Sequence, residues 1–225
     1  MVWDTLWINF GMDTHLKGLK PVFNFMEDKL YVGTAVTAKW VSTNREPVNL
    51  VQKRYVETGR SWIDHNLAAI DFSKPGDIIV IDGEGYKDVA LMGDNMVMLA
   101  KRNGVSAAVL DGGIRDIAKI RKMRFPIFAS GITPKASIGF IETVGFNVPV
   151  TCGGVQVKPG DIIVGDEDGV VSVPRELSKK VLELCMRTLE KEEISKKAIK
   201  DVRYALESYP AGRPEILENL KKRDI

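Results

Sequence analysis

The chain has 225 residues, of which 44% are hydrophobic and 28% charged, as is typical of a folded globular protein and not of a disordered one. The net charge is +2, from 32 basic and 30 acidic residues, so no overall cationic field indicates a nucleic-acid partner. No stretch is apolar enough to span a bilayer. The first residues lack a basic flank followed by an apolar run, so we do not expect secretion. The two cysteines lie in apolar runs away from any zinc-like cluster, which predicts buried thiols and a cytoplasmic protein.

The first half of the chain contains several predicted elements. Residues 1–28 give no clear pattern, and we treat them as an apolar N-terminal segment that packs on the rest. Residues 30–41, rich in Val, Thr and Tyr, predict a strand. Residues 50–70 predict a helix interrupted near Gly59, in which His65 is interpreted as a structural histidine. Residues 78–81 predict a buried strand, and the glycines of residues 82–85 predict a loop near a site.

The stretch from Gly93 to Asp116 is the most informative part of the sequence. Apolar residues at positions 96, 99 and 100 predict a helix that ends before Gly104. Residues 105–110 predict a short buried strand. The sequence Asp-Gly-Gly-Ile-Arg-Asp at residues 111–116 then predicts a turn that presents two opposite charges. Polar groups therefore occur twice, at the start of a helix and after the strand that follows it.

Both polar groups have a chemical use. Residues 94–97 open the predicted helix, so their free N–H groups favour an anion such as a carboxylate. Asp94 is interpreted either as the cap of this helix or as a site residue. Arg115 offers a planar fork for a carboxylate or enolate oxygen, and Asp116 offers a hard oxygen for Mg²⁺ or Mn²⁺. The alternative for Arg115 and Asp116 is a surface turn with a solvated charge pair.

The second half of the chain predicts one further helix, several strands and a long final helix. Residues 117–123 predict a short amphipathic helix with a basic side, which is interpreted as a solvated face because it lacks interleaved aromatic residues. Strands are predicted at 126–128 and within 144–157. We expect a single domain over residues 1–225, with a core of residues 30–175, a C-terminal helix at 176–207 and a tail at 208–225.

The sequence resembles the family of 4-hydroxy-4-methyl-2-oxoglutarate aldolases and the regulator of ribonuclease activity A. The resemblance is carried by the ordered pattern G-D-x-M…A…G…V-x-D-G-G-x-R-D. Ordered blocks over such a length are more specific than a single loop motif. The similarity covers roughly residues 30 to 200. It continues through blocks that begin at Phe125, Asn147, Gly154, Pro159 and Asp166.

This resemblance implies a fold and an activity. The implied fold is a single α/β domain of the swivelling β/β/α type, with a mixed sheet core and a long C-terminal helix. The implied assembly is a homotrimer or hexamer with sites between subunits. The implied activity is that of a divalent-metal-dependent lyase, which cleaves 4-hydroxy-2-oxo acids to pyruvate and also decarboxylates oxaloacetate. The partner is thus a small 2-oxo acid, with no membrane or nucleic acid expected.

The resemblance also implies roles for individual residues. Asp94, Arg115 and Glu192 would take part in the chemistry, with Glu192 reaching the site of a neighbouring subunit. The alternative for Glu192 is an ordinary surface glutamate on the final helix. Asp116 would hold Mg²⁺ or Mn²⁺. The residues implied to bind the substrate lie at the predicted helix start and on the arginine: Gly93, Asn95, Met96 and Arg115.

Two other functions were weighed. One is a non-catalytic regulator that binds and inhibits an endoribonuclease, as the second branch of the resembled family does. The presence of Asp94, Arg115 and Asp116 together favours an enzyme, because inhibition does not require them. The other is methyl transfer, an old label of some family members, which needs a cofactor pocket for which no motif is found. Asn95 replaces an apolar residue common in the aldolases, so the exact substrate stays open.

Overall fold

The computed structural model of the protein describes residues 1–23, 29–199, 218 and 221. In these residues the helices are α1 (Val2–Phe10), α2 (Val48–Thr58), α3 (Asp64–Phe72), α4 (Asp94–Arg102), α5 (Ile117–Met123), the 3-10 helix η1 (Arg175–Leu177) and α6 (Ser178–Ile199). The strands are β1 (Lys20–Pro21), β2 (Tyr31–Ser42), β3 (Ile78–Met92), β4 (Ala107–Ile114), β5 (Ile127–Ile132), β6 (Ile141–Phe146), β7 (Val150–Cys152), β8 (Val155–Val157), β9 (Ile162–Gly165) and β10 (Val170–Val173). The predicted α/β class is confirmed.

A mixed sheet forms the centre of the molecule, with the strand order β1-β5-β4-β3-β2-β9-β10. Strands β2, β3, β4 and β5 are parallel to one another, whereas β1, β9 and β10 pair antiparallel. The second edge of β2 is shared, since β9 pairs with its first residues and β6 with its last. Strands β7 and β8 form a separate hairpin. The predicted mixed sheet core is therefore confirmed.

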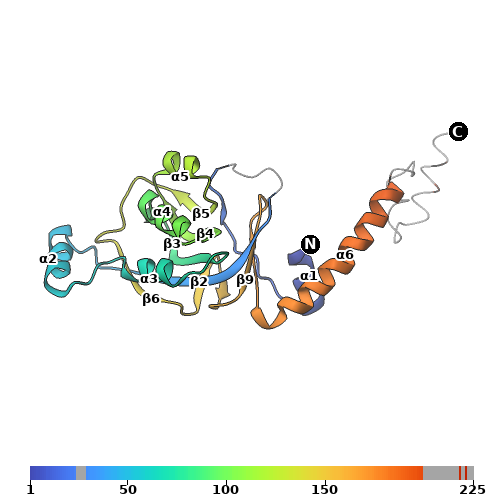
Figure 1. Ribbon diagram of the computed structural model, residues 1–225, viewed down its shortest axis with the longest axis horizontal. Helices are drawn as coiled ribbons and strands as arrows, with labels where there is room; N and C mark the ends of the chain where they lie inside the picture. The colour runs from blue at the N-terminus through green and yellow to red at the C-terminus, as the bar shows by residue number, and fades with distance from the viewer. Residues whose placement is uncertain (24–28, 200–217, 219–220, 222–225) are drawn as a thin grey trace.

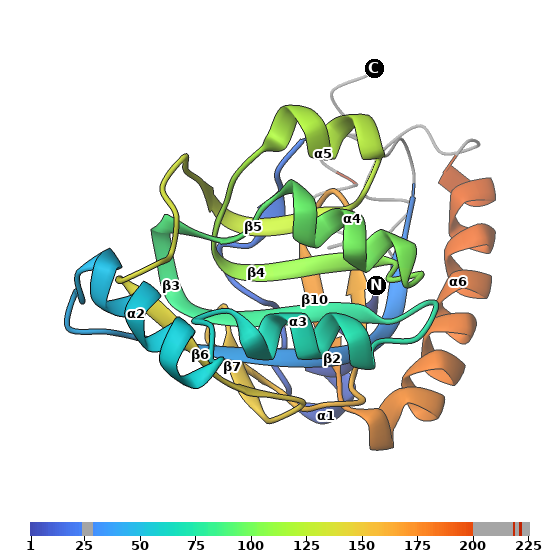
Figure 2. The ribbon, with the colours of Figure 1, turned by 60° about the vertical axis from the view of Figure 1, so that its left-hand side comes forward.

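The parallel strands are buried on both faces, which explains their nearly continuous apolar sequence. Ile79 and Ile81 of β3 belong to the larger core, which includes residues of α3, α4 and α5. Ile78 and Val80 point to the other face and pack in a second core with residues of the β7–β8 hairpin. Figure 2 shows α3, α4 and α5 together over one face of the sheet. Each such buried isoleucine contributes about 1.5–3 kcal/mol.

Two glycine segments that were predicted as loops are parts of strands, so these predictions were wrong. Residues 82–85 belong to β3, which continues to Met92 through shifts of register against β4. Glu84 and Gly85 have positive φ angles of 53° and 69°, as in a strand with a bulge. Strand β4 likewise continues through Gly112, where a Cβ atom would lie 2.5 Å from Leu91 Cδ1. These glycines therefore allow close packing, and the chain turns only after Ile114.

The C-terminal helix begins with η1 and continues as α6, which ends at Ile199 in the described residues. Residues 200–207 of the predicted helix, and nearly all of the predicted tail, lie outside the described residues. Cys185 of α6 packs with Leu6 of α1, and α6 extends away from the sheet in Figure 1. Both Cys152 and Cys185 are buried free thiols, as predicted, and burial raises the pKa of the Cys152 thiol. None of the described helices combines the length and apolar character needed to cross a membrane.

Candidate active site

The start of α4 and the end of β4 meet at one edge of the sheet. Strands β3 and β4 are parallel neighbours, and their last paired residues are Met92 and Ile114. The segments that follow them must therefore leave the sheet side by side, the usual place for a ligand in parallel α/β sheets. Two hydrogen bonds join these segments, since Arg115 N donates to Met92 O at 3.3 Å and Asp94 N donates to Asp116 Oδ2 at 3.3 Å.

A cavity of about 180 Å³ lies at this edge. Its lining includes every residue that the sequence predicted to bind the substrate: Gly93, Asn95, Met96 and Arg115. Asp94 also lines it. Asp116 does not line the cavity but contacts Arg115, with its Oδ2 atom 3.5 Å from Arg115 Nε. The structure thus brings five of the predicted site residues to one cavity and places Asp116 in contact with two of them.

The backbone of Asp116 directs its side chain toward α4. Asp116 has a φ angle of 63°, a left-handed conformation that aspartate adopts more readily than most residues. It is the residue that precedes α5, and its carbonyl accepts the N–H groups of Lys119 and Ile120. The Arg115 and Asp116 side chains are 43% and 32% exposed. The pair is therefore accessible to solvent and lies beside the cavity.

Gly93 leaves space for the side chains of Arg115 and Asp116. Its backbone is extended, with φ at −138°, a conformation open to any residue. A Cβ atom at this position would lie 2.7 Å from Asp116 Oδ2 and 3.0 Å from Arg115 Nε. The absence of a side chain at Gly93 thus lets Arg115 and Asp116 take these positions, and its backbone conformation places no demand for glycine.

The interpretation of Asp94 as a helix cap was wrong. Gly93 occupies the cap position without a side-chain hydrogen bond, and Asp94 is the first residue of α4. Lys119 of α5 instead donates to Asp94 Oδ2 at 2.7 Å. This hydrogen bond holds the pKa of Asp94 below its usual value, and the same contact raises the pKa of Lys119.

Lys119 is the site residue that the sequence analysis missed, because it was grouped with the solvated basic side of its helix. Its spacing was an available signal. Lys119 follows Asp116 by three residues, and positions three apart lie on one face of a helix. A helix that starts at Asp116 therefore directs Lys119 to the same side as the acidic groups, where the structure places it against Asp94.

Two carboxylates are available for a cation at this site. In the part of the chain that the structure describes, no group of three or more His, Cys, Asp or Glu side chains could hold a metal ion. Asp94 and Asp116 nevertheless lie close together, since Asp94 N donates to Asp116 Oδ2 at 3.3 Å. One or two carboxylates suit Mg²⁺, which usually keeps several of its waters. The donors present thus fit a hard divalent cation held largely through water.

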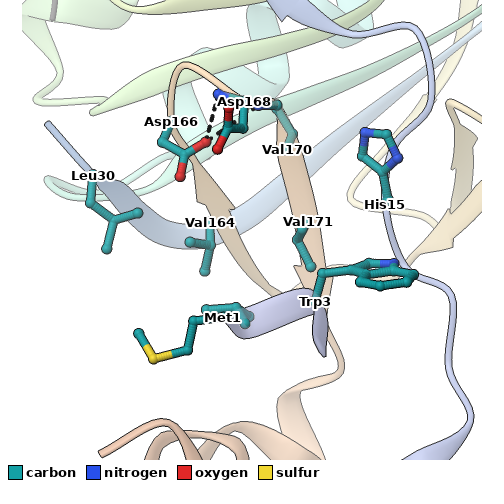
Figure 3. A pocket seen from close by; sticks show the side chains of 11 residues that line it. Met1, Trp3, His15, Leu30, Val164, Asp166, Asp168, Val170 and Val171 are labelled. Carbon is teal, nitrogen blue, oxygen red and sulfur yellow. Dashed lines mark hydrogen bonds between the residues drawn. The ribbon is translucent and has the colours of Figure 1, made fainter. Parts of the chain in front are cut away.

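A larger hollow of about 500 Å³ lies elsewhere, between the N-terminal residues and strands β9 and β10 (Figure 3). It contains none of the predicted site residues. Asp166 on its wall accepts the backbone N–H groups of Asp168 and Gly169, so it stabilises a turn.

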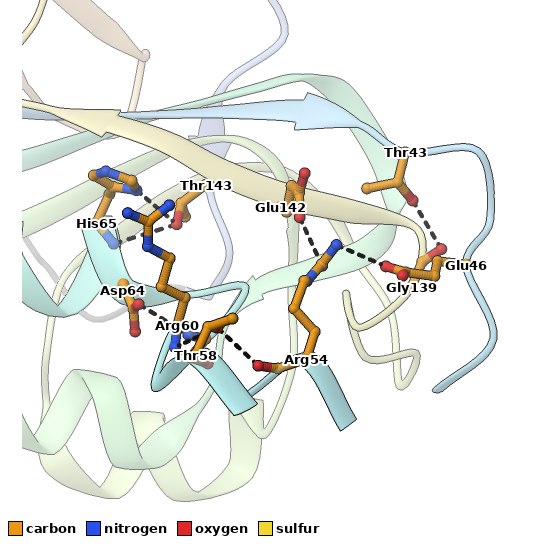
Figure 4. Close-up of polar contacts among 11 residues, drawn as sticks. Thr43, Glu46, Arg54, Thr58, Arg60, Asp64, His65, Gly139, Glu142 and Thr143 are labelled. Carbon is orange, nitrogen blue, oxygen red and sulfur yellow. Dashed lines mark hydrogen bonds and ion pairs between the residues drawn. The ribbon is translucent and has the colours of Figure 1, made fainter. Parts of the chain in front are cut away.

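The polar contacts near α2 are also structural (Figure 4). His65 Nδ1 lies 3.1 Å from Thr143 Oγ1, so the prediction of a hydrogen-bonded structural histidine is confirmed. Arg54 forms ion pairs with Glu46, just before α2, at 3.1 Å and with Glu142 at 3.0 Å, and the second of these attaches α2 to β6. These side chains do not line the cavity at Gly93.

Glu192 does not line this cavity in the same chain. It is exposed on α6, which packs against α1. Its proposed contact with a neighbouring subunit stays a prediction.

The fold and site define an α/β protein in which a helix start, an arginine and one carboxylate line a small cavity, with the carboxylate of Asp116 in contact with them. The chain belongs to the RraA-like family, because the family model described as Aldolase/RraA matches residues 2–172. A Halalkalibacterium halodurans protein provisionally named 4-hydroxy-4-methyl-2-oxoglutarate aldolase is 41% identical over 147 residues, which cover 64% of this chain and 68% of that protein. An uncharacterized protein of Methanocaldococcus jannaschii is 35% identical over 179 residues, 79% of this chain and 76% of that protein.

A solved structure extends the likeness. The structure of Streptomyces coelicolor RraAS2 has a TM-score of 0.72 and 26% sequence identity, and the match covers 87% of this chain and 89% of that chain. It is described as an unusual member of the family of RraA inhibitors of RNase ES. The family therefore includes both proteins named as aldolases and proteins named as inhibitors.

Proposed function

We propose that the protein is a divalent-metal-dependent lyase that cleaves 4-hydroxy-2-oxo acids to pyruvate and decarboxylates oxaloacetate. One observation carries the proposal: a single small cavity is lined by the first residues of α4, by Arg115 and by Asp94, with Asp116 in contact behind them. Both reactions break a carbon–carbon bond and leave the enolate of pyruvate. A site that stabilises this enolate therefore serves both.

The carboxylate of the 2-oxo acid would bind at the start of α4. The N–H groups of Asn95 and Met96 lie in the first turn, where they lack partners within the helix. The guanidinium of Arg115 would balance the negative charge that develops on the keto oxygen as the enolate forms. These two contacts orient the substrate and stabilise its transition state.

Asp94 would position the water that moves the proton. In the retro-aldol step, the 4-hydroxyl proton leaves as the bond between C3 and C4 breaks, and the electron pair passes into the enolate. The same proton equivalent then returns to C3, which gives pyruvate. Lys119 keeps the pKa of Asp94 low, so this carboxylate stays ionised and acts by orienting the water. Glu192 of a neighbouring subunit would assist at the hydroxyl end of the substrate.

Asp116 would hold Mg²⁺ or Mn²⁺, largely through waters. When bound, the ion supplies Lewis-acid polarisation of the substrate carbonyl. We expect pyruvate to bind more tightly with the metal than in EDTA, because metal and substrate would share one site. Isothermal calorimetry measures this directly, and equal affinity in EDTA would argue against a shared site.

The reaction is tested by pyruvate release in an assay coupled to lactate dehydrogenase. The purified protein with Mg²⁺ or Mn²⁺ is offered oxaloacetate or 4-hydroxy-4-methyl-2-oxoglutarate, with a metal-only control for spontaneous decarboxylation. We expect pyruvate above the control. If neither substrate releases it with any metal of a panel, the lyase proposal fails for these substrates.

The likeness to Streptomyces coelicolor RraAS2 supports a second candidate, a regulator that binds and inhibits an endoribonuclease. An inhibitor has no need of a cavity that joins a helix start to Arg115 and two carboxylates, so we place it second. Tight binding to an endoribonuclease, together with no pyruvate release, would reverse this order.

A further inference from the structure

We infer that Ser137 is a further substrate-binding residue, whose hydroxyl donates a hydrogen bond to the distal carboxylate of the substrate, and that Trp62 positions this hydroxyl. The inference rests on the proposed function, from which it takes the binding of the 2-oxo acid end at the start of α4 and at Arg115. A substrate such as 4-hydroxy-4-methyl-2-oxoglutarate carries the distal carboxylate at C5, on the fragment that leaves when the bond between C3 and C4 breaks.

Ser137 lines the cavity from a segment that contributes no charged group to it. This segment, residues 133–140, connects β5 to β6, and Ala136 and Ser137 are its members in the cavity wall. The segment is attached to β3, because the carbonyl of Lys135 accepts the N–H of Ala90 at 2.9 Å and Ala136 forms a parallel bridge with Ala90. Ser137 is only 6% exposed. Its hydroxyl therefore has a fixed place in the wall and little contact with bulk water.

The hydroxyl of Ser137 has one partner and one unused proton. Its Oγ atom lies 3.2 Å from the indole Nε1 of Trp62, and because an indole N–H is a donor only, Oγ accepts this hydrogen bond. Trp62 lines the same cavity and is itself held by its carbonyl, which accepts the N–H of Thr143 at 2.9 Å. Among the described residues, no acceptor is found for the Ser137 proton. A buried donor without an acceptor is unfavourable, so a ligand oxygen in the cavity would gain this hydrogen bond.

The charges around the cavity favour a carboxylate as the acceptor. In the proposed function, Arg115 and the start of α4 bind the 2-oxo acid end, which leaves the Ser137 hydroxyl for the part of the substrate beyond C3. Arg115 is the only cation among the described residues that line the cavity, and the nearby Lys119 is paired with Asp94 at 2.7 Å. A second carboxylate that loses its water here therefore needs a neutral donor. A hydrogen bond to an ionised acceptor is roughly twice as strong as one between neutral groups.

A matched pair of ligands tests the inference without turnover. 2-Oxoglutarate has the main carbon chain and both carboxylates of 4-hydroxy-4-methyl-2-oxoglutarate but lacks the 4-hydroxyl that cleavage requires. 2-Oxopentanoate has a methyl group in place of the distal carboxylate. Calorimetry on the full chain with saturating Mg²⁺ should show at least about tenfold tighter binding of 2-oxoglutarate. Equal or weaker binding of 2-oxoglutarate, or no binding of either compound, overturns the inference.

Substitution of Ser137 then assigns the preference to its hydroxyl. Ser137→Ala should weaken the binding of 2-oxoglutarate by about tenfold, or about 1.4 kcal/mol, and leave that of 2-oxopentanoate within about twofold. In the control Ser130→Ala, the lost hydroxyl donates to Gly112 O at 3.2 Å and does not line the cavity, so both affinities should stay unchanged. Unchanged binding in Ser137→Ala, or equal weakening of both ligands, overturns the role of Ser137. If this variant does not fold, Ser137→Cys, which has a similar size and only a weak donor, is judged by the same two outcomes.

Trp62 is a positioning residue because it acts through Ser137. Trp62→Phe keeps an aromatic ring and removes the N–H that fixes Ser137 Oγ, so it should weaken 2-oxoglutarate by about fivefold and leave 2-oxopentanoate within about twofold. In a Ser137→Ala background the same change should leave the ratio of the two affinities unaltered. A similar loss for 2-oxoglutarate in both backgrounds would show that Trp62 does not act through Ser137.

Kinetics with 4-hydroxy-4-methyl-2-oxoglutarate separate this inference from the lyase proposal. The distal carboxylate is bound in the ground state and in the transition state alike, so Ser137→Ala should raise KM by about tenfold and change kcat little. Pyruvate release with an unchanged KM in this variant leaves the lyase proposal standing and overturns the inference. If the preference for 2-oxoglutarate depends on Ser137 but the protein cleaves no 4-hydroxy-2-oxo acid, the lyase proposal fails and the role of Ser137 stands.

Discussion

Substitution of Gly93 by alanine tests the geometry of the site most directly. The extended backbone of Gly93 accepts alanine without strain, so the new methyl group acts only through its contacts. It would lie 2.7 Å from Asp116 Oδ2, whereas ordinary contact begins at 3.4 Å. The carboxylate must therefore move by at least 0.7 Å, the difference between these distances, and Arg115 must move with it.

The displacement should affect activity far more than stability. A misplacement of about 1 Å can reduce turnover by about 10²-fold, which corresponds to about 2.7 kcal/mol in the activation barrier. Stability should change little, because Arg115 and Asp116 are partly exposed and can rotate. A surface ion pair contributes about 0–1 kcal/mol, and a compatible Gly→Ala change stabilises by about 0.4–1 kcal/mol. The melting temperature should thus stay within about 4 °C.

Pyruvate release and thermal unfolding measure the two effects in parallel. Gly145→Ala is the matched control, because its Cβ atom would meet only Val148, at 3.3 Å, away from the cavity. We expect the control to keep both activity and melting temperature. A Gly93→Ala protein with full activity would refute the argument that the site depends on the placement of Arg115 and Asp116.

Four further changes test separate parts of the proposal. Arg115→Ala should lower kcat/KM by the equivalent of about 3–4 kcal/mol, as loss of one oxyanion donor does; a loss below tenfold would remove the arginine from the transition state. Asp116→Ala should abolish metal-dependent turnover in a folded protein, and a large fall in melting temperature without metal would instead indicate a structural role. Glu192→Ala and Arg115→Ala chains should each be poor alone and recover activity when refolded together, whereas no recovery in demonstrated mixed oligomers would place Glu192 outside the site. Burial raises the pKa of Asp111, so ionisation of this carboxyl destabilises the fold as the pH rises through that pKa. Asp111→Asn should therefore raise the melting temperature at pH 7 and raise it less at pH 4.

Local pattern was sufficient to predict the parallel strands and the helix at the site. A run such as Ile78 to Ile81 can only be buried on both faces, and the helical spacing after Gly93 matches α4. The two failures at the glycine segments have a common cause. A glycine that permits a turn and a glycine that makes room for Leu91 look identical in one sequence, because the difference lies in a neighbouring strand.

The site was predictable as a list of residues but not as a set of contacts. The resemblance indicated Asp94, Arg115 and Asp116. The spacing from Asp116 indicates on which side of α5 Lys119 lies, but it does not predict that Lys119 pairs with Asp94 of another helix. Trp62 could not be predicted for the same reason. It lines the cavity from a segment between α2 and α3, some 30 residues before Gly93. A family resemblance indicates the residues that members of the family share. Trp62 is not among the residues that carried the resemblance, so its place in the wall of the cavity could be found only from the structure.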